Sequence, residues 1–396
     1  MKVLIYHSKS FLAPIGGPSG YLYGLKEVLD KKYDSDIQID FLPEVVTGNK
    51  QKVRTLSKTS SSRLMKKLTS WYQLYKNYKF VKTIIGRNSD PIVDIHQYDV
   101  IHFHSTKDYY LLREELKKYK GKTVLTSHSP QPLSGEFIDR LSNTQKLLLR
   151  SKLKSIIEMD RYAFENADYI LFPCENADEP YVHEWPEYSS IRERRKKHYR
   201  YLVTGTTSAK IKTDRCSVRK KLNIPEDAFV ISYVGRHNQI KGYDRLKEIG
   251  KKFLEKHPDA YVVVAGKEEP IKGLSHPHWI EIGWTNEPHS YVNASDLFIL
   301  PNRETYFDLV MLEVLSTGKY SLISNTGGNK YFKQYVDAGI RYFDTVDDAI
   351  DSIEYVYKME FSERLDKENI NKEIYSENFT TEIFADNYIE FYKKLF

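Results

Sequence analysis

Cysteine is scarce in this sequence, which has two, Cys174 and Cys216, among 396 residues. There is no CxxC pair and no His/Cys cluster at the spacing of zinc ligands. The sequence therefore excludes a disulfide framework and gives no sign of a structural metal site. We expect a protein of a reducing, cytoplasmic compartment.

Long apolar runs are also missing. The apolar run at the N-terminus, Val3–Tyr6, is shorter than the seven to fifteen apolar residues of a signal peptide. No segment approaches the roughly 18 to 20 apolar residues of a membrane-spanning helix. Glycine and proline, 19 and 15 residues, are too few for a collagenous or low-complexity chain. We expect a globular protein that is soluble or peripherally attached to a membrane.

Acidic residues are absent from one long stretch. Between residues 50 and 87 there are eleven Lys and Arg residues and no Asp or Glu. Apolar and aromatic residues alternate with these cations at helical spacing: Leu64, Leu68, Trp71, Tyr72, Leu74, Tyr75 and Tyr78. This pattern favours an amphipathic helix on an anionic membrane surface, although a merely solvated basic face would have the same composition. Nucleic acid is disfavoured, because the rest of the chain contains no nucleic-acid-binding module.

The length predicts two domains, and the order of apolar segments predicts that both are α/β. Short β-branched runs alternate with helical stretches, which is typical of parallel sheets. The predicted strands of the first half are 3–6, 37–42, 100–104, 123–127 and 169–173, and those of the second half are 230–234, 261–265, 279–283, 297–301, 321–324 and 341–343. We predict that the charged tract 184–200 is a helix leading to an interdomain connection near 201–212. An apolar stripe over 378–396 predicts a final helix.

Polar residues follow several of the predicted strands, where ligands of doubly wound folds bind. In the first half these are the glycine-rich loop with Gly16 and Gly17, and the histidines His102, His104 and His128. The loop could approach an anion or simply form a tight turn. We interpret His102 as a packed histidine, and His104 and His128 as polar groups at adjacent strand ends. Two histidines on one strand without a third ligand are poor evidence for a metal.

The second half carries a stronger signal for a diphosphate. The strand 230–234 is followed by Arg236 and Lys241, a fixed guanidinium and a mobile ammonium, which suit two charge-assisted bonds to phosphates. Farther on, Glu313 lies on a helix beginning near Asp308–Val310. Its carboxylate could accept bonds from the two hydroxyls of a ribose, and the N-terminus of that helix could face a phosphate.

These segments resemble glycosyltransferase family 4, retaining enzymes of the GT-B fold found in bacterial surface-polysaccharide synthesis. The matching residues of the second half are Gly235-Arg236, Lys241-Gly242, Tyr291–Pro301, Leu309–Glu313 with Gly318, and Ser324–Gly328. The first half agrees more loosely, through Gly16-Gly17, 99–104, 126–128 and 167–170. The resemblance implies two Rossmann-like domains facing a cleft: an acceptor domain of residues 1–200, joined by a returning helix at 379–396, and a donor domain of residues 201–378.

The resemblance also implies roles for individual residues. Arg236 and Lys241 match the pair that binds the donor diphosphate and stabilises the leaving group, and Glu313 matches the glutamate that holds the nucleotide ribose. His128 matches the catalytic histidine near the transferred sugar. Gly17 matches a loop facing donor phosphate and acceptor, with Gly16 and His104 placed on the acceptor side. In the helix-start segment, Glu304, Asp308 and Leu309 are expected at the donor.

One departure from the family concerns the donor sugar. The family has a second glutamate eight positions before the one that Glu313 matches, and here that position is Thr305. Glu304 or Asp308 could replace it, or the contact could be lost. The sequence thus predicts a metal-independent transferase without a cofactor, using a nucleotide-sugar donor, with UDP favoured, and a lipid-linked or polymeric glycan acceptor at the inner face of the cell membrane. A nucleotide-sugar epimerase and a non-catalytic subunit that stabilises a partner transferase stay open as alternatives.

Overall fold

The computed structural model describes the chain except residues 9–11, 13–17, 33, 35, 43–62, 87–90 and 130, and describes only the backbone of 18, 63–71, 85 and 86. The described residues form two compact units. Unit 1 comprises Met1–Phe172, Tyr181–Leu202 and Tyr388–Phe396, and unit 2 comprises Pro173–Pro180 and Val203–Asn387. Each is described by itself below.

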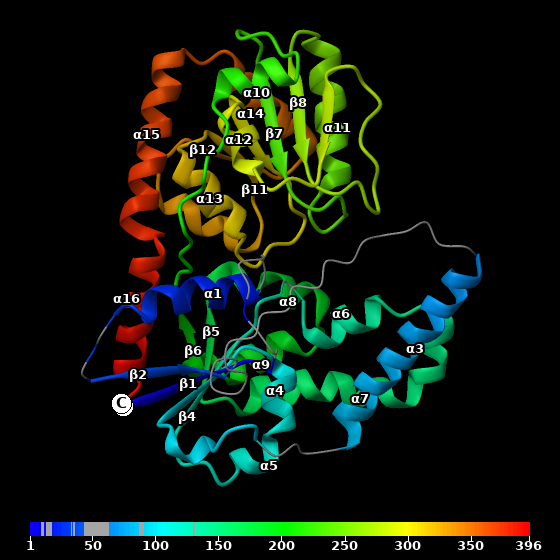
Figure 1. Ribbon diagram of the computed structural model, residues 1–396, viewed down its shortest axis with the longest axis vertical. Coiled ribbons are helices and arrows are strands. Elements are labelled where there is room, and N and C mark those ends of the chain that lie inside the picture. Colours follow the sequence, from blue (N-terminus) through cyan, green and yellow to red (C-terminus); the bar gives the residue numbers. More distant parts are fainter. Residues whose placement is uncertain are drawn as a thin grey trace. The chain divides into compact units, whose positions relative to one another are not determined.

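Unit 1 is built on a six-stranded parallel sheet of order β2-β1-β3-β4-β5-β6 (Figure 1). Its elements are β1 (Lys2–Tyr6), α1 (Pro18–Leu29), β2 (Gln38–Phe41), α3 (Arg63–Gly86), η1 (Ile95–Gln97), β3 (Val100–Phe103), α4 (Thr106–Leu111), α5 (Arg113–Leu116), β4 (Lys122–Thr126), α6 (Leu133–Asp139), α7 (Asn143–Asn166), β5 (Tyr169–Phe172), α9 (Tyr188–Arg194), η3 (Lys196–His198) and β6 (Tyr199–Tyr201), with α8 (Glu179–Glu184) beginning in unit 2.

Unit 2 contains a second six-stranded parallel sheet, of order β12-β11-β10-β7-β8-β9. Its elements are η2 (Glu175–Asp178), α10 (Arg215–Lys221), β7 (Val230–Val234), α11 (Tyr243–Lys256), β8 (Tyr261–Ala265), β9 (Trp279–Gly283), α12 (Pro288–Asn293), β10 (Leu297–Leu300), α13 (Leu309–Thr317), β11 (Ser321–Ser324), η4 (Gly327–Gln334), β12 (Ile340–Phe343), α14 (Val346–Tyr357) and α15 (Phe361–Asn378). The last helix, α16 (Thr381–Lys393), begins in unit 2 and ends in unit 1.

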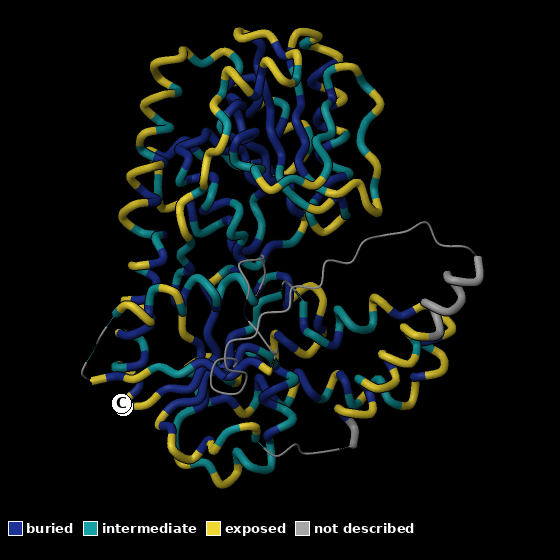
Figure 2. Tube along the Cα trace, viewed as in Figure 1, coloured by how far each residue is buried: buried dark blue, intermediate teal, exposed yellow. Residues whose placement is uncertain are grey.

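The central strands of both sheets are buried on both faces, which explains why they read as continuous apolar runs (Figure 2). In unit 2, β7 and β10 carry Ile231, Leu297 and Ile299 into a core that α11 and α14 cover with Leu246 and Ile353. Helix α7 of unit 1 begins with a capping box, in which the side chain of Ser142 accepts from the backbone of Gln145. Local sequence and burial therefore agree on the same layered architecture.

The C-terminus is fastened to unit 1 by buried tyrosines of α16. The hydroxyl of Tyr392 lies 2.6 Å from Nδ1 of His102 on β3, and that of Tyr388 lies 2.6 Å from the hydroxyl of Tyr21 on α1. At the surface, Lys393 contacts Asp34. Burial of these rings keeps the end of the chain on the first sheet.

All eleven predicted strands are present, but the prediction for 184–200 was wrong in part. The helix α9 ends at Arg194, and the tract closes in the edge strand β6, paired with β5. Tyr-Arg-Tyr is too short and too polar to give a strand signal. The two units divide at other residues than the predicted ranges: 173–180 and 379–387 lie in unit 2, and 201–202 lie in unit 1. Within unit 2, Glu179 contacts Lys330 of η4, and the amide of Thr206 donates to the carbonyl of Phe379 at 2.8 Å.

Candidate functional site

Three loops of unit 2 meet at one edge of its sheet. They follow the carboxyl ends of β7, β10 and β11, and these strands are neighbours in the order β11-β10-β7. The loops span 235–242, 301–308 and 325–328. This is the position at which ligands bind in open parallel sheets. Most of the residues predicted to bind the donor lie on these loops or directly after them.

The first two loops are locked together through the main chain at Gly242. Its φ is +62°, and a Cβ on this residue would lie 1.7 Å from the carbonyl oxygen of Pro301. The carbonyl of Ile240 accepts a hydrogen bond from the amide of Arg303 at 2.9 Å. Only glycine meets both the left-handed conformation and the close approach. The loop that carries Lys241 is therefore fixed against the loop that carries Asp308.

Lys241 and Asp308 form a half-buried ion pair across these two loops. The ammonium lies 2.7 Å from each oxygen of the carboxylate, and the side chains of Lys241 and Asp308 are 22% and 16% exposed. The amide group of Asn302, itself buried, also donates to Asp308. Lys241, the cation predicted to bind a phosphate, is thus present, but in this structure its ammonium is paired with the carboxylate of Asp308. Asp308 also forms the N-terminal cap of α13.

Arg236 lies at the carboxyl end of β7, and its side chain is exposed. Its carbonyl accepts a hydrogen bond from the hydroxyl of Tyr233 at 2.9 Å. Behind this loop, the buried ring of His237 stacks on Tyr243 with ring centroids 3.8 Å apart. Burial lowers the pKa of His237, so this ring is neutral near pH 7. The backbone at Arg236 is therefore held by buried aromatic packing, while its guanidinium stays accessible to an anion.

Glu313 is half-buried on α13 and is paired with a histidine of α12. Its Oε2 lies 3.0 Å from Nε2 of His289. The helix spans Leu309–Thr317, and Gly318, with a φ of +82°, caps its end. The contact of Glu313 with His289 places its carboxylate at a junction of α13 and α12. His289 was not predicted, since it has no motif of its own.

Thr305, which stands where glycosyltransferase family 4, the family that the sequence resembles, has a glutamate, is 1% exposed. Its Oγ1 is buried without a hydrogen-bond partner among the described residues. Its carbonyl accepts from the amide of Gly328 at 3.2 Å, and a Cβ on Gly327, where φ is +46°, would lie 2.0 Å from the same oxygen. The second and third loops are thus interlocked at Thr305. Glu304, next to it, is half-buried.

The third loop is also held by a residue that the sequence did not reveal, Glu179. Its Oε2 accepts from the amide of Gly327 at 2.8 Å, and its Oε1 accepts from Lys330 at 2.6 Å. Burial raises the pKa of Glu179, but the bonds from Lys330 and Gly327 outweigh it and leave the pKa below its usual value. Glu179 lies 148 residues before Gly327 in the chain, so no local pattern could show this contact.

The first-half histidines form a stack in unit 1. The ring of His104 lies between those of His102 and His128, with centroid distances of 4.3 and 4.9 Å. Nδ1 of His104 lies 2.7 Å from Nε2 of His128, and Nε2 of His102 lies 2.7 Å from the hydroxyl of Thr126. His104 is 3% exposed, so it supports His128 rather than lining an open surface.

Burial keeps the two inner histidines neutral. It lowers the pKa of both His102 and His104 well below the usual value, with the neighbouring rings adding to the effect. The bond between Nδ1 of His104 and Nε2 of His128 needs a hydrogen on one of the two nitrogens and a lone pair on the other. The stack therefore fixes the orientation of His128, which is half-buried. Gly16 and Gly17 lie outside the described residues.

The basic segment 50–87 is described in part. Residues 63–86 form α3, and side chains are described from Tyr72 to Ile84. Tyr72 and Tyr75 are exposed, and Lys76 lies over the ring of Tyr72. Residues 50–62 and 87 lie outside the described residues. Among all the residues of the chain that the structure describes, no helix is long and apolar enough to cross a membrane.

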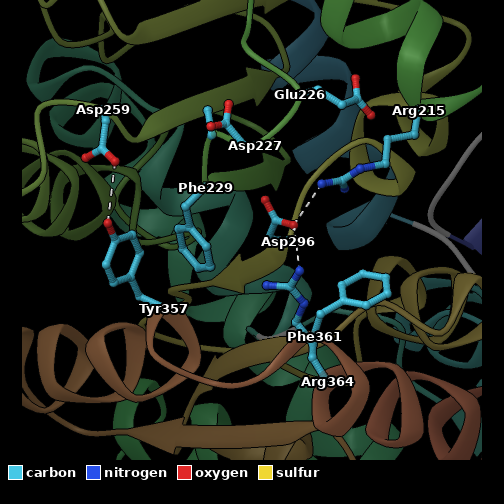
Figure 3. A pocket seen from close by; sticks show the side chains of 10 residues that line it. Arg215, Glu226, Asp227, Phe229, Asp259, Asp296, Tyr357, Phe361 and Arg364 are labelled. Atoms are coloured by element: carbon cyan, nitrogen blue, oxygen red, sulfur yellow. Dashed lines mark hydrogen bonds and ion pairs between the residues drawn. The ribbon is translucent and has the colours of Figure 1, made fainter.

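A separate cavity of about 630 Å³ lies at the opposite edge of the unit 2 sheet, before β7, β8 and β10 (Figure 3). The carboxylate of Asp296 lines this cavity. It accepts hydrogen bonds from Arg215, Arg219 and Arg364 at 2.8 to 3.0 Å. Burial raises the pKa of Asp296, but the three arginines outweigh this and lower it. These bonds fasten α10 and α15 to the sheet, so we interpret this cavity as structural.

Within the described part of the chain, no three His, Cys, Asp or Glu side chains converge in a way that could hold a metal ion. The first two loops carry the charged residues Arg236, Lys241, Arg303, Glu304 and Asp308, and Glu313 follows on α13. The exposed guanidinium of Arg236, the ammonium of Lys241 and the start of α13 are suited to an anion of two phosphates.

Comparison with known proteins identifies the domain that carries this site. Residues 214–373, which carry this site, match the family model of glycosyl transferases group 1. Among curated proteins, the chain is 30% identical over 121 residues to the Escherichia coli UDP-Gal:alpha-D-GlcNAc-diphosphoundecaprenol alpha-1,3-galactosyltransferase. That alignment covers 28% of this chain and 31% of the relative, so the chain matches about a third of its length.

Solved structures resemble the whole chain. A sucrose-phosphate synthase from Thermosynechococcus elongatus superimposes with a TM-score of 0.63 at 16% identity, covering 100% of this chain and 98% of the other. HepE from Anabaena, in complex with UDP, gives a TM-score of 0.59 at 15% identity with 100% coverage of both. At this identity the likeness shows the fold alone. The predicted fold class, GT-B with two parallel α/β domains, is confirmed.

Proposed function

We propose that this protein is a retaining, metal-independent glycosyltransferase that moves a sugar from a UDP-sugar to a lipid-linked or polymeric glycan acceptor. The observation that carries the proposal is that Arg236 and Lys241 follow β7, that Lys241 contacts Asp308 at the start of α13, and that Glu313 lies on α13, all within the residues that match the family model of glycosyl transferases group 1. UDP is favoured because the Escherichia coli relative is named for a UDP-galactose donor and the HepE structure holds UDP.

The donor diphosphate would lie between Arg236 and Lys241. As the bond between the anomeric carbon and the phosphate oxygen breaks, negative charge grows on the leaving UDP. A guanidinium and an ammonium held by packed loops stabilise this charge without moving far, which is the source of most electrostatic catalysis. Two fixed cations can therefore do what a divalent ion does in other transferases. The free amides at the start of α13, near Leu309, add partial positive charge.

Retention follows if the acceptor attacks from the face that UDP leaves. The acceptor hydroxyl oxygen forms the new bond to the anomeric carbon, and its proton passes to the departing phosphate oxygen. An α-linked donor then gives an α-linked product. His128, oriented by His104, is proposed to contact the transferred sugar, and Gly16 and Gly17 to lie on the acceptor side.

The nucleoside would be held by Glu313. Its Oε2 is engaged by His289 at 3.0 Å, and its Oε1 is left for a ribose hydroxyl. Because His289 is half-buried and close to the carboxylate, it holds Glu313 in one orientation. The predicted role of Glu313 therefore fits its surroundings.

The acceptor and the location of the reaction are proposed from the basic surface and from the relative. A lipid diphosphate acceptor, as in the name of the Escherichia coli enzyme, would bring the chain to the inner face of a cell membrane. The exposed lysines and tyrosines of α3 fit such a surface. Synthesis of a bacterial surface polysaccharide is the corresponding process.

Thermal shift with UDP, GDP and ADP tests the donor site. UDP at a hundred times its Kd should stabilise unit 2 by about 2.7 kcal/mol, which is a shift of a few degrees. Arg236→Ala and Lys241→Ala should each abolish most of the shift, while Lys251→Ala, an exposed lysine on α11, should leave it intact. No shift with any nucleotide would overturn the assignment. If Arg236→Ala and Lys241→Ala show the same UDP-induced shift as Lys251→Ala, neither Arg236 nor Lys241 belongs to the site.

Product analysis separates the activity from its alternatives. Incubation with UDP-sugars and EDTA should release UDP, and NMR of the sugar formed should show the anomeric configuration of the donor. An inverted product contradicts retention, and activity lost in EDTA but restored by Mg²⁺ contradicts metal independence. Interconversion of the free UDP-sugar without transfer would instead indicate the epimerase.

A further inference from the structure

Two adjacent leucines project from the first half of α7 in unit 1. Leu147 is 71% exposed and Leu148 is 63% exposed, whereas Leu149 beside them is buried. An isolated exposed leucine is ordinary on a protein surface, but a pair in one helical turn is a concentrated apolar feature.

The helix that carries these leucines packs against α3, which carries the exposed Tyr72 and Tyr75. The two helices pack together through Val81 and Ile84 of α3 and Leu149 and Ile156 of α7. At the edge of this contact, the ammonium of Lys152 lies 5.1 Å from the ring centroid of Tyr78.

Helical periodicity relates other exposed residues to this contact. Leu148 lies one turn before Lys152 on α7, and Tyr75 lies one turn before Tyr78 on α3, so each lies on the same side of its own helix as the contacting residue. Leu147 lies on the adjoining side of α7, next to Leu148 in the chain. Tyr75 is 60% exposed. We call the surface formed by Tyr75, Tyr78, Leu147, Leu148 and Lys152 the α3/α7 surface.

The charged residues of these two helical segments are all basic. From residue 72 to 84 they are Lys76, Lys79 and Lys82, and from residue 143 to 157 they are Lys146, Arg150, Lys152 and Lys154, with no Asp or Glu in either range. Helix segments that combine exposed apolar and aromatic side chains with cations alone are complementary to an anionic lipid surface. Tyrosine is suited to the level of the lipid headgroups, and lysine stems can extend back to them.

Other occupants fit less well. A second copy of the chain related by a two-fold axis would place seven cations against the same seven cations. A nucleic acid would pair with the cations but would leave two exposed leucines without a role. The bilayer alone uses both the apolar and the cationic groups.

We propose that the α3/α7 surface docks the protein on an anionic bilayer, with Leu147 and Leu148 inserted among the lipid chains. The inference rests on the proposed function, whose lipid-linked acceptor it would bring within reach, and it names the residues that make the contact. The sequence predicted a membrane contact through the segment 50–87 alone, whereas the proposed docking surface combines α3 with α7.

Vesicle co-sedimentation of the full chain tests the proposal. Binding to phosphatidylcholine vesicles with 30% phosphatidylglycerol is expected, with little binding to pure phosphatidylcholine and weaker binding at high salt. Leu147→Ser with Leu148→Ser should lower the partition at least tenfold. Lys152→Gln with Lys154→Gln should lower it about fivefold for each lost cation.

Matched controls lie in unit 2. Val336→Ser replaces an apolar side chain that is 85% exposed, and Lys220→Gln with Lys251→Gln removes two exposed helical lysines. All of these should bind vesicles as the wild type does. The UDP thermal shift of every variant should be unchanged, which shows that the variants fold.

Equal binding to both kinds of vesicle would overturn the docking proposal, as would full binding by the leucine variant. A wild-type dimer that the leucine variant converts to monomer would also overturn it and would assign the surface to a second copy. If UDP shifts the melt but vesicles do not bind, docking fails and the donor site stands. If vesicles bind but no nucleotide shifts the melt, the proposed function fails and docking stands.

Discussion

Replacing Asp308 by asparagine should tighten the binding of UDP, because Asp308 competes with phosphate for Lys241. In the structure both carboxylate oxygens lie 2.7 Å from the ammonium. A diphosphate can use Lys241 fully only if this contact loosens. Asparagine keeps the shape and an acceptor for Asn302, but it removes the charge.

The size of the effect follows from the exposure of the pair. Two unit charges about 4 Å apart attract by about 4 kcal/mol at an effective dielectric constant near 20. Rehydration of the released carboxylate offsets most of this, because both side chains still contact solvent. Exposed pairs contribute at most about 1 kcal/mol net. We therefore expect Asp308→Asn to lower the Kd for UDP by about fivefold.

Calorimetric titration of UDP into wild type, Asp308→Asn, Lys241→Ala and the double variant measures this. Since the gain acts through the ammonium, Asp308→Asn should add nothing in the Lys241→Ala background. Asp244→Asn is the matched control, because Asp244 pairs with Arg303 and not with Lys241. Weaker UDP binding by Asp308→Asn would refute the reasoning, since it would mean that Asp308 holds Lys241 in its binding position.

Three further predictions concern stability. Gly242→Ala should destabilise unit 2 by at least 1 to 3 kcal/mol and abolish the UDP shift, seen in thermal melts, because φ of +62° and the carbonyl of Pro301 both oppose a Cβ. Glu179→Gln should lower the free energy of unfolding by about 1 to 3 kcal/mol at pH 7 in urea titrations. Because the pKa of Glu179 is lowered in the fold, its contribution to stability is present above the usual Glu pKa and is lost on acidification. The variant should lack this dependence on acid. Burial lowers the pKa of His102 and His104, so on acidification the unfolded chain takes up protons before the folded one. Stability should therefore fall from about pH 7 toward pH 5.5, by about 1.4 kcal/mol per histidine for each pH unit below 6.5. A His104→Gln protein should show a shallower fall, and an equal fall would contradict the assignment.

The strands could be predicted because burial on both faces leaves a direct mark on the sequence. Val230–Val234 and Leu297–Leu300 are apolar throughout, as parallel strands covered by helices must be. The edge strand β6, Tyr199–Tyr201, was missed because only one of its residues is buried. An edge strand owes its structure to the neighbouring strand rather than to its own composition.

The site could be predicted only as far as its residues follow strands. Arg236, Lys241 and Glu313 were found because their positions relative to β7 and α13 are local. The contact of Lys241 with Asp308 joins residues 67 apart, and that of Glu179 with Gly327 joins residues 148 apart. Such pairs depend on which loops the topology brings together, and a single sequence does not show which loops become neighbours.

The missing first glutamate of the family can now be related to the Lys241 contact. Thr305 occupies that position with a side chain buried between two loops, so a carboxylate there would have to be desolvated. Asp308, three residues later, has both oxygens engaged by Lys241 until a diphosphate draws the ammonium away. Its carboxylate would then become available to a sugar hydroxyl only when the phosphates are bound. In that case Asp308→Asn should tighten UDP more than UDP-sugar, so the ratio of the two affinities, measured in the same titrations, decides whether Asp308 has taken over the sugar contact.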